Sequence, residues 1–343
     1  PAGFIGGMYD FIFYKNGKAL DLGTAFVDVV DRTEVPQVPG STVYGRVIDH
    51  TGKPIAGVSV SDGVFVTATD DEGRYYLSSL KQRGYVFITV PAGYRAAVNR
   101  TIPQFFRRLS GSPQTYEQRS FVLAPETNER HRMIVFTDTH LANRTNDAAQ
   151  FTQFTTDLNA YMAQHSGQKM YALTLGDMTW DLYWYKNNYA LPQYRETINR
   201  QVKNLQIYHT MGNHDNDFMT TSDYDAAVKY VDCIGPTFYS FNIGQVHYVV
   251  MDNIDCSAYD GTDSRNYVKK LSNEQLKWLA KDLAYVDKST PLIVAMHAQI
   301  YKPTSTGFAF DHDSANTEAL LAALDGYEDH FVTGHTHKDY NIT

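Results

Sequence analysis

The sequence predicts an α/β domain preceded by a small all-β sandwich. Residues 41–125 contain short stretches that alternate polar and apolar residues, separated by turns rich in Gly and Asp, which is typical of a β-sandwich. From Arg130 onward, apolar strands alternate with amphipathic helices, the pattern of an α/β architecture. A third observation, the polar residues that end five of these strands, points to the function.

Length and charge narrow the possibilities. The chain has 343 residues, which suits two or three domains better than one. It has 30 Lys and Arg against 38 Asp and Glu, a formal net charge of −8. This charge argues against nucleic acid as the main partner, because affinity for a phosphate backbone needs clustered Lys and Arg. Purely apolar runs such as 292–296 are only a few residues long, so we expect no transmembrane segment.

The first forty residues predict a hairpin and a linker. Residues 8–14 have the composition of a strand, Asn16-Gly17 is a strong hairpin turn, and residues 25–30 are the expected partner strand. Two strands cannot bury a face by themselves. We therefore expect residues 1–35 to be a fragment of an upstream β domain and the Pro-spaced residues 36–40 to be a linker.

Both ends suggest a piece of a longer protein. The chain starts without a Met or a signal peptide, and it ends six residues after His337. We expect residues 126–343 to form a C-terminally truncated catalytic domain, with a further C-terminal domain that completes the pocket.

Three helices are predicted in the second half. Apolar residues share one face over about 146–165. Tyr194, Ile198, Val202 and Leu205 are spaced 4, 4 and 3, and Leu276, Leu279, Leu283 and Val286 are spaced 3, 4 and 3. The third helix begins with Ser272 and has Gln275 three residues later, which is the pattern of a capping box.

Five predicted strands end in residues that can bind a metal. The strands are 133–137, 171–175, 207–211, 292–296 and 330–333. The residues that follow them are Asp138 and His140, Asp177, Asn213 with His214 and Asp215, His297, and His335 with His337. Ligands of open α/β sheets bind at the carboxyl ends of the strands. One such ending means little, but five in one chain are a strong signal.

The residue types favour a two-metal hydrolase. Asp138 and His140 lie two apart, so an extended segment can point both at one ion, and the two oxygens of Asp177 can bridge two ions. A mixed set of oxygen and nitrogen ligands without thiolates suits Mn, Fe or Zn, and the ligand types do not select among them. Each residue also has a structural alternative, such as a turn or a helix cap. His297 alone would more often be a buried core histidine.

This series of motifs resembles the calcineurin-like metallophosphoesterase superfamily. The resemblance spans about 138–337 and includes Asp-x-His, Gly-Asp, Gly-Asn-His-Asp, His and Gly-His-x-His. It implies a four-layer α/β sandwich. Residues 45–75 are similar to the carboxypeptidase-regulatory-like (transthyretin-like) sandwich, which implies an accessory domain without catalysis. Together the two parts resemble secreted bacterial members of the superfamily.

The resemblance also implies roles for individual residues. One metal ion would take Asp138, His140, Asp177 and His337, and the second Asp177, Asn213, His297 and His335. A hydroxide that bridges the two metals would attack phosphorus, and His214 would assist the leaving group while Asp215 orients it.

Substrate contacts are less defined. Asn143 and Arg144 follow His140 closely enough to reach a phosphate oxygen, although they also fit a solvated helix start. Trp180, Asp181 and Tyr183 follow Asp177 in an aromatic stretch. A stretch this aromatic fits core packing slightly better, but its position beside a metal ligand also fits a substrate wall.

The two cysteines suggest a disulfide. Residues 243–246 read as a two-residue hairpin with Gly244 at the first central position. Extending the register that pairs Ile243 with Val246 places Cys233 opposite Cys256. Pro236 would interrupt the ladder before that point, and the bond also depends on export, so the pairing is a hypothesis.

The function expected from these residues is hydrolysis of phosphomonoesters or phosphodiesters by a binuclear metal enzyme. We expect a small phosphorylated substrate and a periplasmic, cell-surface or secreted location. The alternative is an exported glycan- or partner-binding protein with a vestigial metal site. A nuclease of the same superfamily fits least, because the chain has no basic stripe.

Overall fold

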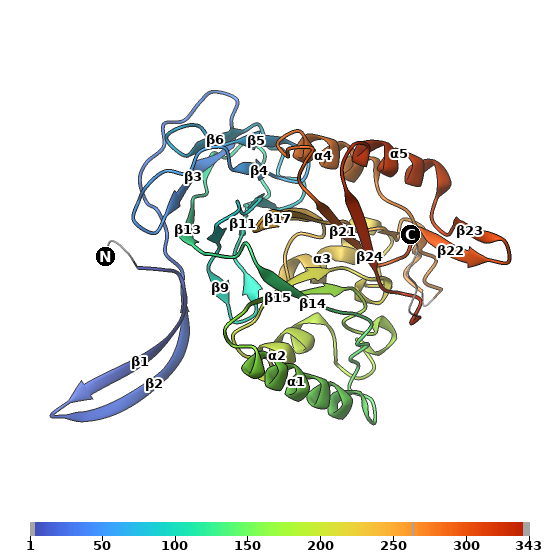
Figure 1. Ribbon diagram of the computed structural model, residues 1–343, viewed down its shortest axis with the longest axis horizontal. Helices are drawn as coiled ribbons and strands as arrows, with labels where there is room; N and C mark the ends of the chain where they lie inside the picture. Colours follow the sequence, from blue (N-terminus) through green and yellow to red (C-terminus); the bar gives the residue numbers. More distant parts are fainter. Residues whose placement is uncertain (1–3, 263, 339–343) are drawn as a thin grey trace.

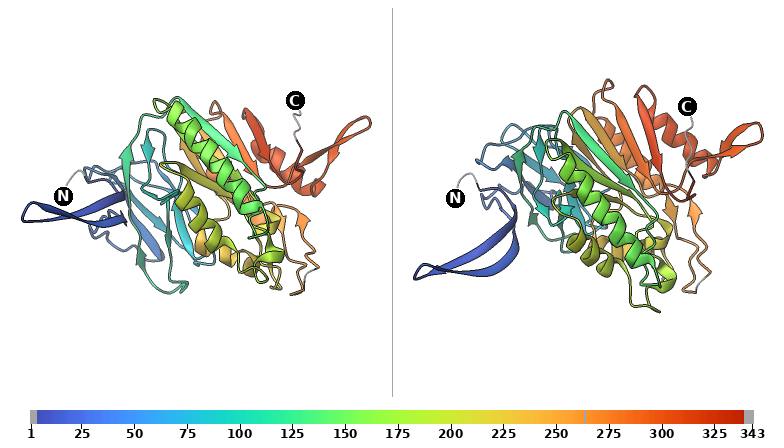
Figure 2. Two further views of the ribbon diagram at one scale, coloured as in Figure 1. Left: turned by 90° about the horizontal axis from the view of Figure 1, so that it is seen from below. Right: turned by 60° about the horizontal axis from the view of Figure 1, so that its bottom comes forward.

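The computed structural model describes residues 4–262 and 264–338. The chain begins with a long hairpin that projects from the rest of the molecule (Figures 1 and 2). It consists of β1 (Gly7–Lys15) and β2 (Lys18–Val27), joined by the two-residue turn Asn16-Gly17. Both turn residues have the positive φ angles that a tight two-residue hairpin requires. The second strand therefore begins directly after the turn, at Lys18, and not at residue 25 as expected.

Two sheets form the predicted sandwich. One contains β3 (Val43–Asp49), β6 (Arg74–Leu77), β8 (Tyr94–Arg95), β12 (Glu117–Gln118) and β13 (Phe121–Pro125). The other has the order β11 (Phe106–Arg108), β7 (Tyr85–Ile88), β4 (Ser59–Ser61) and β5 (Val66–Ala68). The short strands β9 (Val98–Asn99) and β10 (Ile102–Pro103) pair with each other.

The second half contains two further sheets. The first is parallel and has the order β14 (His131–Phe136), β15 (Lys169–Leu175) and β16 (Gln206–Thr210). The second has the order β17 (Tyr239–Ile243), β18 (Val246–Val250), β21 (Leu292–Met296) and β24 (Asp329–Thr333), with only the β17–β18 pair antiparallel. Two small pairs complete the strands, β19 (Ile254–Asp255) with β20 (Val268–Lys269) and β22 (Tyr301–Thr304) with β23 (Gly307–Phe310).

Helices cover both outer faces of these sheets and give the predicted four layers (Figure 1). The helices are α1 (Asp147–Gln164), α2 (Leu191–Gln201), α3 (Asp223–Cys233), α4 (Asn273–Leu283) and α5 (Ser314–Leu324). Residues of α1 and α2 pack with Ala172 and Ile207 of the first sheet. Residues of α4 and α5 pack with Val249 and Val294 of the second sheet. Between the sheets, Tyr208 stacks on Phe241.

The predicted helices are confirmed, but two end early. α2 ends at Gln201 and α4 at Leu283, although Val202, the residue after α2, is still buried. Ser272 caps α4 by accepting a hydrogen bond from the Gln275 amide. The Gln275 side chain does not complete the capping box, because it exchanges hydrogen bonds with the backbone of Asp252.

The sandwich and the α/β part share one hydrophobic core. The Trp278 ring of α4 lies 6.0 Å from Phe87 of the sandwich and 5.1 Å from Phe238. The Asn242 amide also donates to the carbonyl of Val90 at 2.9 Å. These contacts fix the sandwich near the amino-terminal ends of the parallel strands of the second sheet.

The predicted hairpin register is correct, but the predicted disulfide is wrong. Ile243 pairs with Val246 and Phe241 with Tyr248. However, β17 begins only at Tyr239, and Cys233 is the last residue of α3, so the ladder does not reach it. Both cysteines are free thiols. Cys256 is fully buried in a small cluster with Ile254 and Tyr259, where it packs as a small apolar side chain.

Within the part of the chain that the structure describes, no helix is both long and apolar enough to cross a membrane.

Candidate metal centre

The structure brings the residues that end the five predicted strands to one edge of the two sheets. These strands are β14, β15, β16, β21 and β24, all parallel to their neighbours where they pair with one another. Their carboxyl ends therefore point the same way within each sheet. Two groups of side chains result, and the carboxylate of Asp177 in the second group also lies near His140 of the first.

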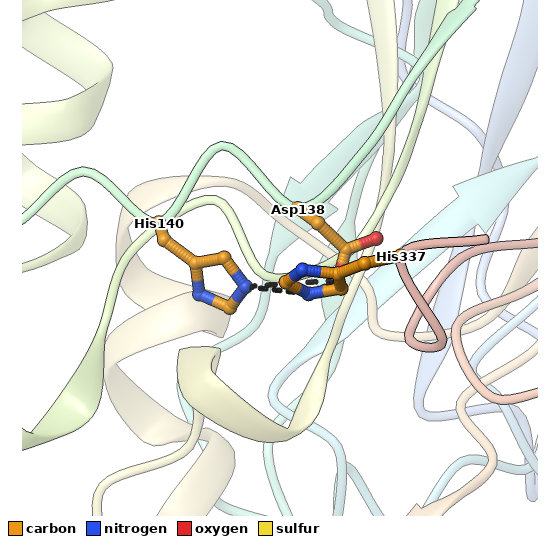
Figure 3. A group of neighbouring side chains, drawn as sticks. All are labelled: Asp138, His140 and His337. Atoms are coloured by element: carbon orange, nitrogen blue, oxygen red, sulfur yellow. Dashed lines mark hydrogen bonds and ion pairs between the residues drawn. The ribbon is translucent and has the colours of Figure 1, made fainter. Parts of the chain in front are cut away.

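The first group consists of Asp138, His140 and His337 (Figure 3). The Nε2 atoms of the two histidines are 3.1 Å apart. The Oδ1 atom of Asp138 lies 3.1 Å from His337 Nε2 and 3.7 Å from His140 Nε2. This group is open to solvent on one side, because the side chain of His337 is 57% exposed.

The second group consists of Asp177, Asn213, His297 and His335, and it is more deeply buried. His297 Nε2 lies 3.0 Å from Asn213 Oδ1, 3.1 Å from His335 Nδ1 and 3.3 Å from Asp177 Oδ2. The other ring nitrogen of His297 is 2.7 Å from the carbonyl of Leu175. That carbonyl can only accept, so Nδ1 carries a hydrogen and Nε2 is the ring nitrogen that faces the group.

Asp177 connects the two groups through one oxygen. Its Oδ2 lies 3.3 Å from His297 Nε2 and 3.8 Å from His140 Nε2. Its other oxygen, Oδ1, accepts a hydrogen bond from the backbone amide of His214. The carboxylate is thereby fixed with Oδ2 between the two sets of imidazoles.

The donor set fits metal ions. Asp138 Oδ2 accepts hydrogen bonds from Thr137 and from the His335 amide, whereas the buried Oδ1 has no hydrogen-bond partner among the described residues. A buried carboxylate oxygen without a partner is unfavourable unless a cation meets it. Several imidazole and carboxylate lone pairs face one another here, and imidazole with carboxylate suits Mn, Fe or Zn.

Unusual backbone conformations hold these ligands in place. Five of the seven have positive φ angles, at 53° for Asp138, 45° for His140, 52° for Asp177, 71° for His335 and 53° for His337. Such conformations are unfavourable for residues other than Gly, by about 1–3 kcal/mol each, and they cluster at functional sites. The sheets must therefore stabilise a strained edge.

Two glycines allow the close approach of these segments. A Cβ atom on Gly212 would lie 2.3 Å from the amide nitrogen of Asp177, and one on Gly334 would lie 2.7 Å from Asp138 Oδ2. Both contacts are too short for any other residue. The Gly in the Gly-Asn-His-Asp and Gly-His-x-His motifs is thus required by packing against a ligand.

Electrostatics at the centre follow from burial and from the carboxylates. Burial alone would raise the pKa of Asp177, but the neighbouring His297 outweighs it and holds that pKa well below its usual range. Burial would lower the pKa of His297, yet the charge of Asp177 raises it to about 9. Burial lowers the pKa of both His140 and His335 to about 4, which leaves these two imidazoles neutral and able to bind a metal.

His214 is oriented by Asp181, not by Asp215 as expected. Its Nδ1 lies 2.7 Å from Asp181 Oδ1. Burial by itself lowers the pKa of His214, but the hydrogen bond to Asp181 raises it above the usual value. Asp181 follows Asp177 by four residues, on the short 3₁₀ helix η1 (Asp181–Tyr183), and this helix lies against a second one, η2 (Asn213–Asp215).

Asp215 has a structural place instead. Its carboxylate is fully buried and accepts hydrogen bonds from the backbone amides of Met178, Thr179 and Gly212. Burial, together with the nearby Asp177, raises the pKa of Asp215 to about 7. It therefore joins the loops after β15 and β16, and its sequence position beside His214 was misleading because its side chain points the other way.

The expected substrate residues lie around this centre in different ways. Arg144 donates to the carbonyl of His140 at 3.1 Å and stacks over the ring of Trp180 at 4.4 Å. Trp180 in turn packs against His140 and His214, and Tyr183 packs against Trp180. Asn143 is exposed and also has a positive φ. Trp184, in the same aromatic stretch, is buried in the core, so part of the stretch packs as core.

Two residues that contact this centre were not predicted from the sequence. Arg265 Nη1 lies 3.2 Å from Asp181 Oδ1, and the Tyr267 ring meets the His335 ring edge-on at 6.2 Å. Both come from the loop between β19 and β20, which has neither a motif nor a strong periodicity. No local signal in the sequence indicates that this loop reaches the metal centre.

Comparison with known families agrees with this geometry. Residues 131–339 match the model of the calcineurin-like phosphoesterase family, and residues 41–126 match that of the N-terminal region of calcineurin-like phosphoesterases. The chain therefore belongs to the calcineurin-like phosphoesterase family. No curated protein matches the chain.

Proposed function

We propose that this protein hydrolyses phosphate esters with two metal ions held at the carboxyl edge of its sheets. Membership of a phosphoesterase family supports a metal-dependent hydrolase in general. The observation that carries the finer proposal is the position of Asp177 Oδ2, between the ligand group of His140 and that of His297. A shared carboxylate oxygen is what a pair of ions about 3.5–4 Å apart requires.

The ligands divide between the two ions. Asp138, His140 and His337 would hold one, and Asn213, His297 and His335 the other, with Asp177 on both. Bound divalent ions would supply Lewis-acid polarisation of the phosphoryl oxygens and a lowered pKa for coordinated water. Leu175, through its carbonyl, keeps the Nε2 lone pair of His297 directed at the site.

His214 would provide the proton for the leaving group. Asp181 holds its Nδ1, so Nε2 is the nitrogen left to face a substrate. The same hydrogen bond favours the protonated imidazole, which is the form that can act as an acid. Arg144 would contact a phosphate oxygen, and its contacts with Trp180 and with the carbonyl of His140 support this role.

The proposed substrate is a small phosphorylated molecule, either a monoester or a diester. The resemblance to secreted members of the family supports export as part of the proposal.

Metal analysis combined with turnover tests this function. The protein would be stripped with a chelator, reconstituted with Mn²⁺, Zn²⁺ or Fe²⁺, and assayed on p-nitrophenyl phosphate and bis(p-nitrophenyl) phosphate. We expect about two ions per chain and turnover of at least one substrate only after reconstitution. Absence of both bound metal and turnover would favour the binding-protein alternative.

A further inference from the structure

A loop outside the two main sheets reaches the catalytic histidine. The loop connects β19 with β20 and carries Arg265, whose backbone has a positive φ of 45°. Beneath it lies a small hydrophobic cluster, formed by Phe218, Ala226, Ile254, Cys256, Tyr259 and Ala298, with Tyr267 packed against it. The loop is therefore anchored on both sides of Arg265 and holds it in a conformation that a free segment would avoid.

One oxygen of Asp181 collects three donors. Asp181 Oδ1 lies 2.7 Å from His214 Nδ1, 2.9 Å from the Leu182 amide and 3.2 Å from Arg265 Nη1. Arg265 Nη1 is also 3.4 Å from His214 Nδ1. The three side chains come from three different segments, so their meeting is a product of the tertiary structure.

Burial gives this contact its importance. Asp181 is fully buried, and a buried carboxylate is unfavourable unless cations and hydrogen bonds compensate for lost water. Arg265 and the Leu182 amide contact the same oxygen of Asp181 that His214 contacts. Because a guanidinium group carries a positive charge and donates in a fixed geometry, Arg265 can hold this oxygen in one position.

We propose that Arg265 is a positioning residue that holds Asp181, and through it His214, for proton donation to the leaving oxygen. The proposal rests on the proposed phosphoesterase function. In that reaction water adds its oxygen to phosphorus and releases a proton to solvent, while the bond from phosphorus to the leaving oxygen breaks. The leaving oxygen takes the proton of His214, and solvent returns a proton to His214 after the reaction. Arg265 touches neither the phosphorus nor the metal ligands, and it acts only by fixing the acid.

Substrates with different leaving groups test this role. p-Nitrophenolate is a weak base and leaves easily without a proton. The phenolate of phenyl phosphate is a stronger base, so its departure depends more on protonation. We expect Arg265→Gln to lower kcat for phenyl phosphate about 10- to 100-fold but for p-nitrophenyl phosphate less than about threefold, since a general acid contributes about 10²–10⁴-fold. KM should change less than about twofold for both, and Arg265→Lys should restore part of the loss.

Control variants separate positioning from folding. Arg200→Gln removes an exposed Arg of α2 that pairs with Glu196 at 3.6 Å, and it should change neither substrate's kcat. Adding Arg265→Gln to His214→Ala should cause no further loss for phenyl phosphate, because the acid is already absent. Equal losses on both substrates, a change in KM alone, or no loss would each overturn the proposal.

A spectroscopic measurement keeps this inference separate from the proposed function. The Nδ1–H proton of His214, identified by its disappearance in His214→Ala, can be followed by NMR in the metal-loaded protein. We expect Arg265→Gln to shift or broaden it and Arg200→Gln to leave it unchanged. If wild-type protein hydrolyses neither ester, the proposed function fails, and an unchanged proton signal in Arg265→Gln would overturn the positioning role on its own.

Discussion

The two ends of the second sheet each hold a fully buried histidine, and the two serve different purposes. His247, at the amino-terminal end in β18, and His297, just after the carboxyl end of β21, both have 0% exposure. His247 lies 2.9 Å from Asn242 Oδ1 and 3.2 Å from Asp282 Oδ2, so each ring nitrogen meets one acceptor. His297 satisfies only Nδ1 in this way, and its Nε2 faces three potential metal ligands at once.

This difference shows that burial of a histidine does not by itself indicate a site. At the amino-terminal end the network is complete, because Asp282 also accepts from Thr89, whose hydroxyl pairs with Ser240. These contacts join the sandwich to the α/β part. At the carboxyl end, Nε2 of His297 instead faces an amide oxygen, an imidazole nitrogen and a carboxylate oxygen, which are the atom types that a divalent metal ion binds.

The largest expected effect comes from removing the atom shared by both ligand groups. Asp177→Asn should lower kcat at least about 1,000-fold and reduce the bound metal below one ion per chain, because the carboxylate would contact both ions. Turnover and metal content would be measured together. Asp157→Asn, on the exposed face of α1, is the matched control and should retain both. Full activity of Asp177→Asn would contradict the two-ion centre.

Replacing each of the two buried histidines with Ala tests the difference between the two ends of the sheet directly. His297→Ala should remove about one ion per chain and lower kcat at least about 100-fold, since it would remove a ligand of one ion. His247→Ala should retain both ions but lower the free energy of unfolding by about 1–3 kcal/mol, because it removes the ring nitrogens that meet Asn242 Oδ1 and Asp282 Oδ2. Metal analysis and denaturant unfolding give the two readouts. Loss of metal in His247→Ala would show that the two ends are not separate.

The two carboxylates near His214 should also differ. Asp181→Asn should lower kcat about 10- to 100-fold, as expected for a partner that orients a functional imidazole. Asp215→Asn should instead lower the free energy of unfolding by about 1–3 kcal/mol, because an amide NH₂ would face backbone donors. Kinetics and thermal unfolding of both variants show which carboxylate orients His214 and which one stabilises the fold. The reverse assignment of effects would restore Asp215 as the orienting residue.

A smaller effect is expected from a buried ion pair in the sandwich. The carboxylate of Glu117 lies 2.6 Å from Lys81 Nζ and accepts a hydrogen bond from Ser110. Burial by itself would raise the pKa of Glu117, but these contacts outweigh burial and lower the pKa from 4.5 to about 2. Because the folded pKa is depressed, the stabilisation is present above pH 4.5 and is lost as the pH falls toward 2. It amounts to about 3 kcal/mol at most.

Acid unfolding checks this expectation. Between pH 4.5 and 2, Glu117→Gln should lose less stability than wild type, while Glu274→Gln, at a more exposed pair with Arg83, should behave like wild type. Identical pH profiles for Glu117→Gln and wild type would contradict it. Since Glu117 lies far from the metal ligands in sequence and in a different sheet, the profile reports on the sandwich.

Much of the fold and of the ligand set could be predicted because a strand and the residues that follow it form a short, continuous segment of the sequence. Strand 292–296 was predicted with the bounds that β21 has, and the hairpin at Gly244 fixed the register of β17 with β18. The error over Cys233 arose from extending that register past Pro236, where the chain is already helical. The partner of His214 was assigned to a neighbour in sequence, whereas side-chain direction selects a residue 33 positions away.

The sequence by itself determined the order of the elements, the residues at the carboxyl ends of the strands and the type of chemistry they suit. Alternation, helical spacing and motif residues are properties of short segments, and short segments are what a sequence displays. Only the tertiary structure decided that Asp177 Oδ2 lies between two groups of imidazoles, that Asp181 orients His214 and that Arg265 reaches both. These contacts depend on loop conformations and on packing between distant segments, which local preferences do not encode.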